Sequence, residues 1–172
     1  MLFRSSRYNA ELANGLGNLV NRALSMLKKY RGGIVPPRHA ELSPDATSAV
    51  RAVRECYEGY ELQEALVKAW ALVTRANQYV DQTAPFKLAK DPTQATRLDE
   101  VLYNLVEVCR ILAILVWPVM PETAQKMFQQ LGLSARPERF ADAAWGMLEP
   151  GHPVGEPAAL FPRRDIPAKP GV

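Results

Sequence analysis

Residues 91–121 read DPTQATRLDEVLYNLVEVCRILAILVWPVMP, and this stretch decides the fold class. The second half of the helix expected here is apolar on nearly all sides, which is typical of a helix at the centre of a bundle. Its boundaries are set by Asp91-Pro92 at the start and by Trp117-Pro118 at the end, because proline cannot continue a helix. The sequence therefore predicts a central helix that runs to about Val116.

The same stretch holds the most apolar segment of the chain, Val101–Met120, which is as long as a membrane span. It also contains Glu107 and Arg110, three residues apart, and it ends in a proline-rich turn. Charged side chains inside a membrane-spanning helix are costly. We therefore expect a buried helix of a globular protein here.

Four further helices are predicted on either side of the central one, each with apolar side chains at helical spacing. Their approximate ranges are 7–30, 43–58, 62–81 and 122–131. Ser43-Pro44 opens the second of them in the preferred manner, with Ser as N-cap and Pro at the first helical position. Gly132 is expected to cap the last one at its C-terminus.

Together these elements predict an all-α fold, an antiparallel bundle of about five helices with short connections, over residues 1–133. Residues 134–172 are expected to form a C-terminal extension, with one short helix between Arg136 and Trp145. From Pro150 onward six prolines fall within 23 residues, which predicts an extended tail. Leu160-Phe161 gives this tail an apolar anchor, so we expect it to pack on the bundle or on another domain.

Positive charge is concentrated in the first third of the chain. Residues 1–54 hold nine Lys/Arg against three Asp/Glu, a net of +6, whereas residues 55–172 hold twelve against fifteen, a net of −3. A basic first third is compatible with a surface that faces phosphates. A solvated helix face explains it about as well.

Side chains suited to catalysis or metal binding are few. The two histidines, His39 and His152, lie in proline-flanked loops, and we expect no carboxylate or cysteine arranged around them. Cys56 and Cys109 lack metal-ligand spacing and are expected to be reduced core residues of a cytoplasmic protein. The sequence contains neither a glycine-rich phosphate loop after a strand nor a Gly-x-Ser-x-Gly elbow. We therefore expect no catalytic site and no metal site in this chain.

A polar row on the first helix is the main candidate for a binding site. Asn14, Asn18 and Arg22 are spaced i, i+4, i+8, so they project from one side of the helix, opposite its leucines. Asparagine is a mediocre helix former, which favours a functional use of this row. An Asn amide and an Arg fork can read the Watson–Crick edge of an unstacked base. The alternative is a polar seam against a neighbouring helix.

Pro85-Phe86 is the second candidate. A proline-fixed loop that presents an aromatic ring, followed by Lys87 and Lys90, suits base stacking with phosphate contacts nearby. The alternative is that Phe86 fills a gap in the core.

Six segments, in order along nearly the whole chain, resemble the methionyl-tRNA synthetase family. Each motif is weak alone, but the ordered combination separates this family from related class I synthetases. The segments are RYNAELAN (7–14), GNLVNR (17–22), ANQYVD (76–81), TAPFKLAK (83–90), PVMPETA (118–124) and LFPR (160–163).

The resemblance implies a helical domain that reads the CAU anticodon of methionine tRNAs. In this family an Asn and an Arg on the first helix, with a Pro-Trp pair after a later helix, contact the cytosine at the first anticodon position. By motif match these roles fall on Asn18, Arg22, Pro85 and Phe86, with Asn14 as an addition on the same face. The domain would serve methionine–tRNA ligase, which attaches methionine to tRNA using ATP.

Two positions depart from the family pattern. Phe86 stands where Trp is usual, so the stacking area is smaller and the indole donor is absent. Gly15 stands where an acidic residue is common, which loosens the helix and removes a charge beside the reading face.

The family's nucleotide-binding fold, its His-Ile-Gly-His-like motif and its Lys-Met-Ser-Lys-Ser-like loop do not occur in these residues. We expect them N-terminal to Met1 in a complete protein, with the sites for ATP and zinc, and we expect no cofactor and no activity in this chain alone. The expected partners are methionine tRNA, through its anticodon loop, and the catalytic domain of the same enzyme, in the cytoplasm, with no membrane and no DNA. The alternative is a stand-alone helical protein-interaction module or a synthetase paralogue without aminoacylation.

Overall fold

Helix α6 (Ala95–Val116) lies at the centre of the molecule, as the sequence predicts. The structure, a computed structural model, describes residues 8–133 and 139–161, and of residues 8–11 it describes the backbone. Every residue of α6 from Val101 to Val116 is buried. The helix begins three residues later than expected, because Pro92–Gln94 form a 3-10 turn, η2, in which the Asp91 carboxylate accepts the Thr93 N–H at 2.9 Å.

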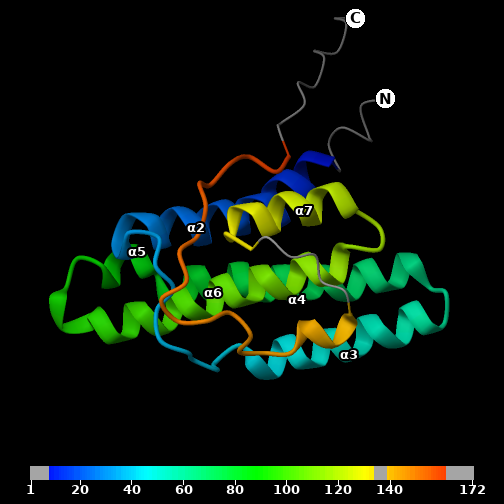
Figure 1. Ribbon diagram of the computed structural model, residues 1–172, viewed down its shortest axis with the longest axis horizontal. Helices are drawn as coiled ribbons and strands as arrows, with labels where there is room; N and C mark the ends of the chain where they lie inside the picture. Colours follow the sequence, from blue (N-terminus) through cyan, green and yellow to red (C-terminus); the bar gives the residue numbers. More distant parts are fainter. Residues whose placement is uncertain (1–7, 134–138, 162–172) are drawn as a thin grey trace, which may run out of the picture.

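Five α-helices of ten or more residues make up most of the described chain, and the predicted all-α bundle is confirmed (Figure 1). Besides α6 they are α2 (Asn18–Arg31), α3 (Ser43–Glu58), α4 (Leu62–Thr83) and α7 (Pro121–Gln130), with a single-turn helix, α5 (Pro85–Leu88), after α4. The helices α2, α3, α4, α5 and α7 all contact α6. Within the described residues the extended backbone pairs at one isolated bridge, Ile34 with Pro153.

The directions of the helices decide which side chains meet. Arg31 at the end of α2 pairs with Asp99 near the start of α6, so these two helices run antiparallel. In contrast, α2 and α4 run parallel, since the beginning of the first helix contacts Asn77 and the later Arg22 contacts Asp81. This parallel pair forms the groove described below.

The first helix is not the regular α-helix that the sequence predicts. Its N-terminal part, η1 (Tyr8–Gly17), is a π-helix, and α2 continues from Asn18. A π-helix bonds each residue to the fifth residue along the chain, which makes a wider turn than in an α-helix. Within this element Leu16 is fully buried and Asn14 is exposed.

The start of α3 differs from the expected cap. Ser43 is the first helical residue, Leu42 precedes it as N-cap, and no side-chain cap bond forms. The Leu42 N–H instead donates to the Asn104 side chain of α6 at 2.8 Å. A distant residue thus organises this helix start.

The described C-terminal segment, residues 139–161, packs across the bundle from the α3 side to the α2 side (Figure 1). Its helical part is a four-residue 3-10 helix, η3 (Phe140–Ala143), and residues 136–138 of the helix expected here lie outside the described residues. No helix continues through residues 151–161, and the part of the expected tail at 162–172 also lies outside the described residues. Leu160 near the end of the segment is 5% exposed.

A buried ion pair holds the first part of this segment. Glu107 is fully buried and Arg110 is 5% exposed, and the guanidinium donates to both carboxylate oxygens at 2.8 and 2.9 Å. Arg110 also donates to the carbonyls of Asp142 and Ala144, both at 2.6 Å. The Glu107 carboxylate accepts three further bonds, from the N–H groups of Gly146, Met147 and Leu148.

No helix in the described chain has the length and apolarity to cross a membrane.

The rest of the segment closes on α7 through backbone contacts. Gly132, directly after α7, has a φ of 72°, which glycine adopts without strain. A Cβ atom there would lie 2.3 Å from the Pro153 carbonyl oxygen, so the close approach needs a glycine. The Ala158 N–H donates to the buried side chain of Gln130 at 3.0 Å.

Candidate nucleic-acid interface

The polar row lies on the exposed side of the first helix. Asn14 in η1 and Asn18 at the start of α2 are exposed, whereas Leu16 and Leu19 are fully buried. Polar and apolar side chains therefore occupy opposite faces, as their spacing predicts. Both asparagines therefore lie on the solvent-facing side of the helix.

The polar row opens into a groove between the first helix and α4. From the first helix the groove is lined by Asn14, Asn18 and Arg22, and from α4 by Trp70, Asn77 and Asp81. Asn77 joins the two walls, because its Nδ2 donates to the carbonyls of Gly15 at 3.4 Å and Val73 at 3.1 Å. The contact between the two helices is thus made by Asn77, while Asn14 and Asn18 of the polar row are exposed.

Arg22 forms an ion pair across this groove. Its Nη2 lies 3.0 Å from Oδ1 of Asp81, and the two side chains are 32% and 70% exposed. Exposed pairs of this kind contribute about 0–1 kcal/mol. The pair therefore orients the Arg22 guanidinium at the rim of the groove. Replacing Asp81 by a ligand as the partner of Arg22 would cost little free energy.

Pro85 and Phe86 lie on the segment that follows Asp81. Ala84, with a φ of 44°, ends α4, and Pro85 begins α5. Pro85 is buried, whereas Phe86 is 48% exposed, so the ring does not fill the core. Lys87 and Lys90 are exposed as well.

The structure thus brings three of the five predicted site residues together in one groove and places the other two beyond its end. Asn14, Asn18 and Arg22 line the groove. Pro85 and Phe86 are outside its lining, four and five residues after the partner of Arg22. RNA contact by all five stays a prediction.

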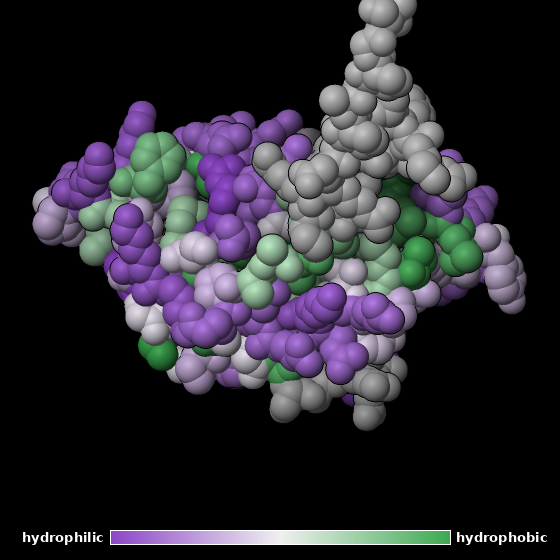
Figure 2. Space-filling model, turned by 90° about the horizontal axis from the view of Figure 1, so that it is seen from above, coloured by the Kyte–Doolittle hydropathy of each residue, from purple (hydrophilic) through white to green (hydrophobic). Residues whose placement is uncertain are grey.

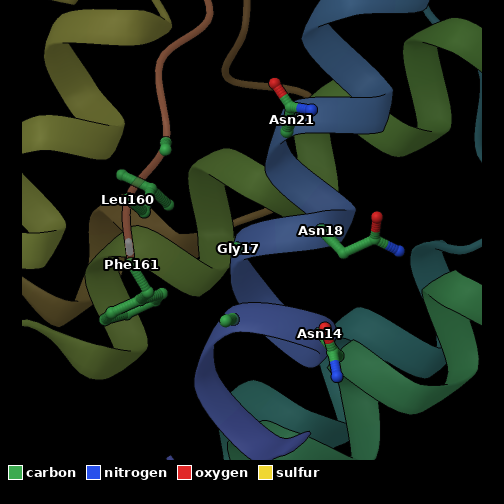
Figure 3. A pocket seen from close by; sticks show the side chains of 8 residues that line it. Asn14, Gly17, Asn18, Asn21, Leu160 and Phe161 are labelled. Carbon is green, nitrogen blue, oxygen red and sulfur yellow. The ribbon is translucent and has the colours of Figure 1, made fainter. Parts of the chain in front are cut away.

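A second hollow lies between the first helix and the end of the described C-terminal segment (Figure 3). Asn14 and Asn18 line this hollow as well as the groove, and its further lining includes Gly17, Leu160 and Phe161. Figure 3 shows Asn14 and Asn18 extending to one side of the helix, with Leu160 and Phe161 on the other. A Cβ at Gly17 would lie 3.1 Å from the Phe161 ring, so the tail packs closely against the junction of η1 and α2.

The face seen from above is mixed in character. In the part of Figure 2 that is not grey, hydrophobic side chains form separate areas among hydrophilic ones. Apolar side chains scattered in this way are normal on protein surfaces.

Sequence reasoning missed two groove residues, Trp70 and Asn77, as candidates. Trp70 is half-buried on α4 and lines the same groove as Asn14 and Asn18. The available signal was the spacing of Trp70, Thr74 and Gln78, at i, i+4 and i+8, beside the apolar stripe of α4.

The expectation that no carboxylate lies near His39 is wrong. Its Nε2 is 3.1 Å from Oε1 of Glu100, which also pairs with Arg97. Arg97 pairs in turn with Glu41, and the hydrogen bond from Arg97 is the main reason why the pKa of Glu41 is lowered. The Tyr79 hydroxyl also donates to Glu41 at 2.6 Å. This network fastens the loop before α3 to α4 and α6.

Both cysteines are buried, and the Cys109 side chain is enclosed by α6 and its neighbours, which raises the pKa of this thiol to about 12. Within residues 8–133 and 139–161, no group of three or more His, Cys, Asp or Glu side chains could hold a metal ion.

Comparison with known proteins assigns the chain to one family. The family described as the anticodon binding domain of methionyl tRNA ligase matches residues 30–166. The methionine–tRNA ligase of Caldanaerobacter subterraneus is 39% identical over 167 residues, which cover 94% of this chain and 26% of that protein. The ligase of Enterococcus faecalis is 40% identical over 94% of this chain and 25% of that protein. This chain thus spans about a quarter of the length of these relatives.

Solved structures agree with this assignment. The apo form of Mycobacterium tuberculosis methionyl-tRNA synthetase superposes with a TM-score of 0.84 at 35% identity, over 94% of this chain and 34% of that chain. The same enzyme bound by methionyl-adenylate gives a TM-score of 0.82 at 36% identity, over 91% of this chain and 32% of that chain. The curated relatives also cover nearly all of this chain, including most of the region before residue 30 that carries the polar row.

Proposed function

This chain belongs to the family of anticodon-binding domains of methionyl-tRNA ligase, and we propose that it binds the CAU anticodon loop of methionine tRNAs through the groove between its first helix and α4. The observation that carries this proposal is that Asn14, Asn18 and Arg22 line one open groove. The curated relatives favour this function over a protein-interaction module.

The chemistry of the groove suits an unstacked pyrimidine. The Asn18 amide offers a donor and an acceptor, and the Arg22 fork offers donors in a fixed plane. Sequence-specific RNA recognition commonly targets loop bases whose Watson–Crick edges are open to such groups. Together Asn18 and Arg22 would read the edge of the first anticodon base, a cytosine.

Exchange of the ion pair is part of this proposal. Arg22 now donates to Asp81, whose side chain is 70% exposed. A base edge or phosphate that approaches the rim takes over Arg22 donors at little cost, because the surface pair is weak. Asn14, one turn away, adds a second amide.

Phe86 would supply the stacking surface. Phe86 is 48% exposed, and the preceding Pro85 is buried and fixes the backbone, which keeps Phe86 at the surface. Stacking of a base on an aromatic ring contributes about 1–3 kcal/mol. Lys87 and Lys90 on the same segment are suited to nearby phosphates.

The wider activity is proposed from the relatives alone. As part of a methionine–tRNA ligase, the domain would present tRNA to a catalytic domain that joins methionine to it with ATP. ATP, and zinc where that domain uses it, would bind outside these residues. The cytoplasm stays the expected location.

The proposal is tested by fluorescence anisotropy with two RNA stem-loops that differ only at the first anticodon base, CAU and GAU. We expect the wild-type chain to prefer CAU. Asn18→Ala and Arg22→Ala should each weaken CAU binding by 1–3 kcal/mol, roughly 5- to 140-fold, the range of base-reading contacts.

Asn21→Ala is the matched control. Asn21 is also an exposed asparagine of α2, but it is outside the lining of the groove. We expect its substitution to leave CAU affinity within about twofold, since surface changes away from a site have small effects. Equal wild-type affinity for CAU and GAU, unchanged by Asn18→Ala and Arg22→Ala, would refute the proposed function.

A further inference from the structure

The last described residues of the chain lie against the first helix at the place where its geometry changes. Gly17 is the last residue of the π-helix η1, and Asn18 is the first residue of α2. The Phe161 ring packs beside this junction, since a Cβ atom at Gly17 would lie 3.1 Å from its Cδ2 atom. The polar row crosses the same place, with Asn14 before the junction and Asn18 after it.

Gly17 provides space and is not needed for its backbone conformation. Its φ of −61° and ψ of −43° are helical angles that any residue adopts. A Cβ atom here would meet the Phe161 ring at 3.1 Å and the Leu12 carbonyl oxygen at 3.2 Å. The missing side chain therefore allows the ring to approach the helix closely.

The junction has little rigidity of its own. Gly15 and Gly17 both lie in η1, and glycine weakens a helix because it loses the most backbone freedom on folding. π-Helical turns are rare and occur mostly as short interruptions of α-helices. Contacts from other elements must therefore hold η1. The Asn77 side chain of α4 supplies one, to the Gly15 carbonyl at 3.4 Å, and Phe161 supplies another.

The end of the C-terminal segment faces the first helix across the second hollow (Figure 3). Within the described chain this hollow is lined by residues of the first helix and by residues 159–161. Leu160 is buried, and the Ala158 N–H donates to the Gln130 side chain at 3.0 Å. Phe161 is thus held against the first helix by a segment that is fastened to α7.

The place where η1 ends decides how the two asparagines project. A π turn contains more residues than an α turn, so moving its end by one residue rotates Asn14 relative to Asn18 about the helix axis. Both residues line the groove, one from each side of the junction. Groups that recognise a ligand have to be held at a fixed relative position by the residues behind them.

We propose that Phe161 is a positioning residue for anticodon reading. It packs on Gly17, fixes the end of η1 and so holds Asn14 and Asn18 in the orientation that the groove uses. Phe161 is outside the lining of the groove, so it acts through the asparagines. The inference rests on the proposed function, since the task it gives to Phe161 requires that the polar row reads RNA.

The test compares CAU and GAU stem-loops by fluorescence anisotropy, well below the thermal midpoint of each variant. Phe161→Ala removes the ring. Gly17→Ala displaces the ring but raises helix propensity, so it separates a loss of specificity from a loss of stability. Val154→Ala is the matched control, because Val154 is a buried residue of the same segment outside the lining of the groove and of the second hollow.

We expect Phe161→Ala to weaken CAU binding at least about fivefold, the lower end of the range for one base-reading contact. GAU binding should change by less than about twofold, because phosphate contacts carry no sequence information. Gly17→Ala should lower the CAU preference in the same direction. Val154→Ala should lower the thermal midpoint and leave the CAU preference unchanged.

A variant that lacks both asparagines shows whether Phe161 acts through them. When Asn14→Ala and Asn18→Ala are combined, the addition of Phe161→Ala should cause no further loss of CAU preference. A further loss as large as in the wild-type background would overturn the inference.

A purely structural role of Phe161 would weaken CAU and GAU binding by the same factor, and that result would overturn the inference. So would unchanged binding of both loops by Phe161→Ala. If Phe161→Ala does not fold, Gly17→Ala decides, and a CAU preference equal to that of the wild type would then overturn the inference. In each case a wild-type CAU preference that depends on Asn18 would still support the proposed function, whereas a wild type without CAU preference would overturn both.

Discussion

The ion pair between Glu107 and Arg110 allows a quantitative test of how the C-terminal segment is held. The change is Arg110→Met, which keeps the length of the side chain and removes its charge. Four hydrogen bonds are lost, two to the Glu107 carboxylate and two to the carbonyls of residues 142 and 144. The Glu107 carboxylate, fully buried, keeps its three backbone N–H donors but loses its counterion.

Removing one partner of a buried ion pair costs about 3–5 kcal/mol, because the remaining charge stays uncompensated. For a chain of 172 residues this lowers the thermal midpoint by roughly 6–20 °C. The measurement is thermal and urea unfolding followed by circular dichroism. The backbone amides of residues 139–161 should be the first to lose protection from hydrogen exchange, because the ion pair holds this segment on α6.

Two further variants test whether the uncompensated charge of Glu107 causes the loss of stability. Glu107→Gln combined with Arg110→Met leaves no unpaired charge, so it should be less destabilised than Arg110→Met alone. Arg51→Met removes an exposed arginine of α3 and should change stability by less than about 0.5 kcal/mol. A cost of less than about 1 kcal/mol for Arg110→Met, or a double variant that is less stable than the single one, would contradict an uncompensated charge at Glu107.

Three other predictions follow from the packing. The pKa of Glu41 is lowered in the folded state, chiefly by the hydrogen bond from Arg97. The stability that Glu41 contributes is therefore present above its ordinary pKa of 4.5 and is lost as pH falls through the lowered value. In the Glu41→Gln variant the unfolding midpoint should depend less on pH in that window. Burial raises the pKa of Cys109 to about 12, so a thiol reagent at pH 8 should not modify this thiol until the protein unfolds. Modification of Cys109 in the folded protein as fast as that of a free cysteine would contradict this. Gly132→Ala combines a left-handed φ with a Cβ 2.3 Å from the Pro153 carbonyl oxygen, so it should destabilise the chain by more than the roughly 1–2 kcal/mol of the backbone conformation alone, as read from urea midpoints.

The central helix could be predicted from the apolar character of its sequence alone. A segment that is apolar on nearly all sides has to be buried, and residues 101–116 are buried without exception. The charged residues Glu107 and Arg110 correctly favoured a buried helix over a membrane span. What the spacing of these two residues could not reveal is that their remaining hydrogen bonds go to a segment more than thirty residues later.

The ends of the helices were less predictable. Ser43 has the residue type of an N-cap, but its neighbour Leu42 takes the position, because Asn104 from α6 supplies the hydrogen bond. Such a contact joins residues 62 positions apart and leaves no local trace in the sequence. The π-helical turn of η1 is also invisible to spacing, since its side chains still alternate between an apolar and a polar face.

The candidate site was predictable on one wall only. The row of Asn14, Asn18 and Arg22 is visible in the sequence because polar residues recur every fourth position on a helix. Trp70 on the opposite wall shares a helix side with Thr74 and Gln78, but this spacing alone does not show which helix lies opposite them. Only the parallel packing of α2 and α4 shows that these residues face the Asn row.

The return of residues 142–148 to the central helix has a consequence during synthesis, when the chain leaves the ribosome from its N-terminus. All helices up to α7 emerge before the backbone groups that satisfy Glu107 and Arg110. Until those residues arrive, we expect water to satisfy Glu107 and Arg110, and this side of α6 to stay uncovered. We therefore expect this side of the bundle to close only after residues 142–148 have been translated.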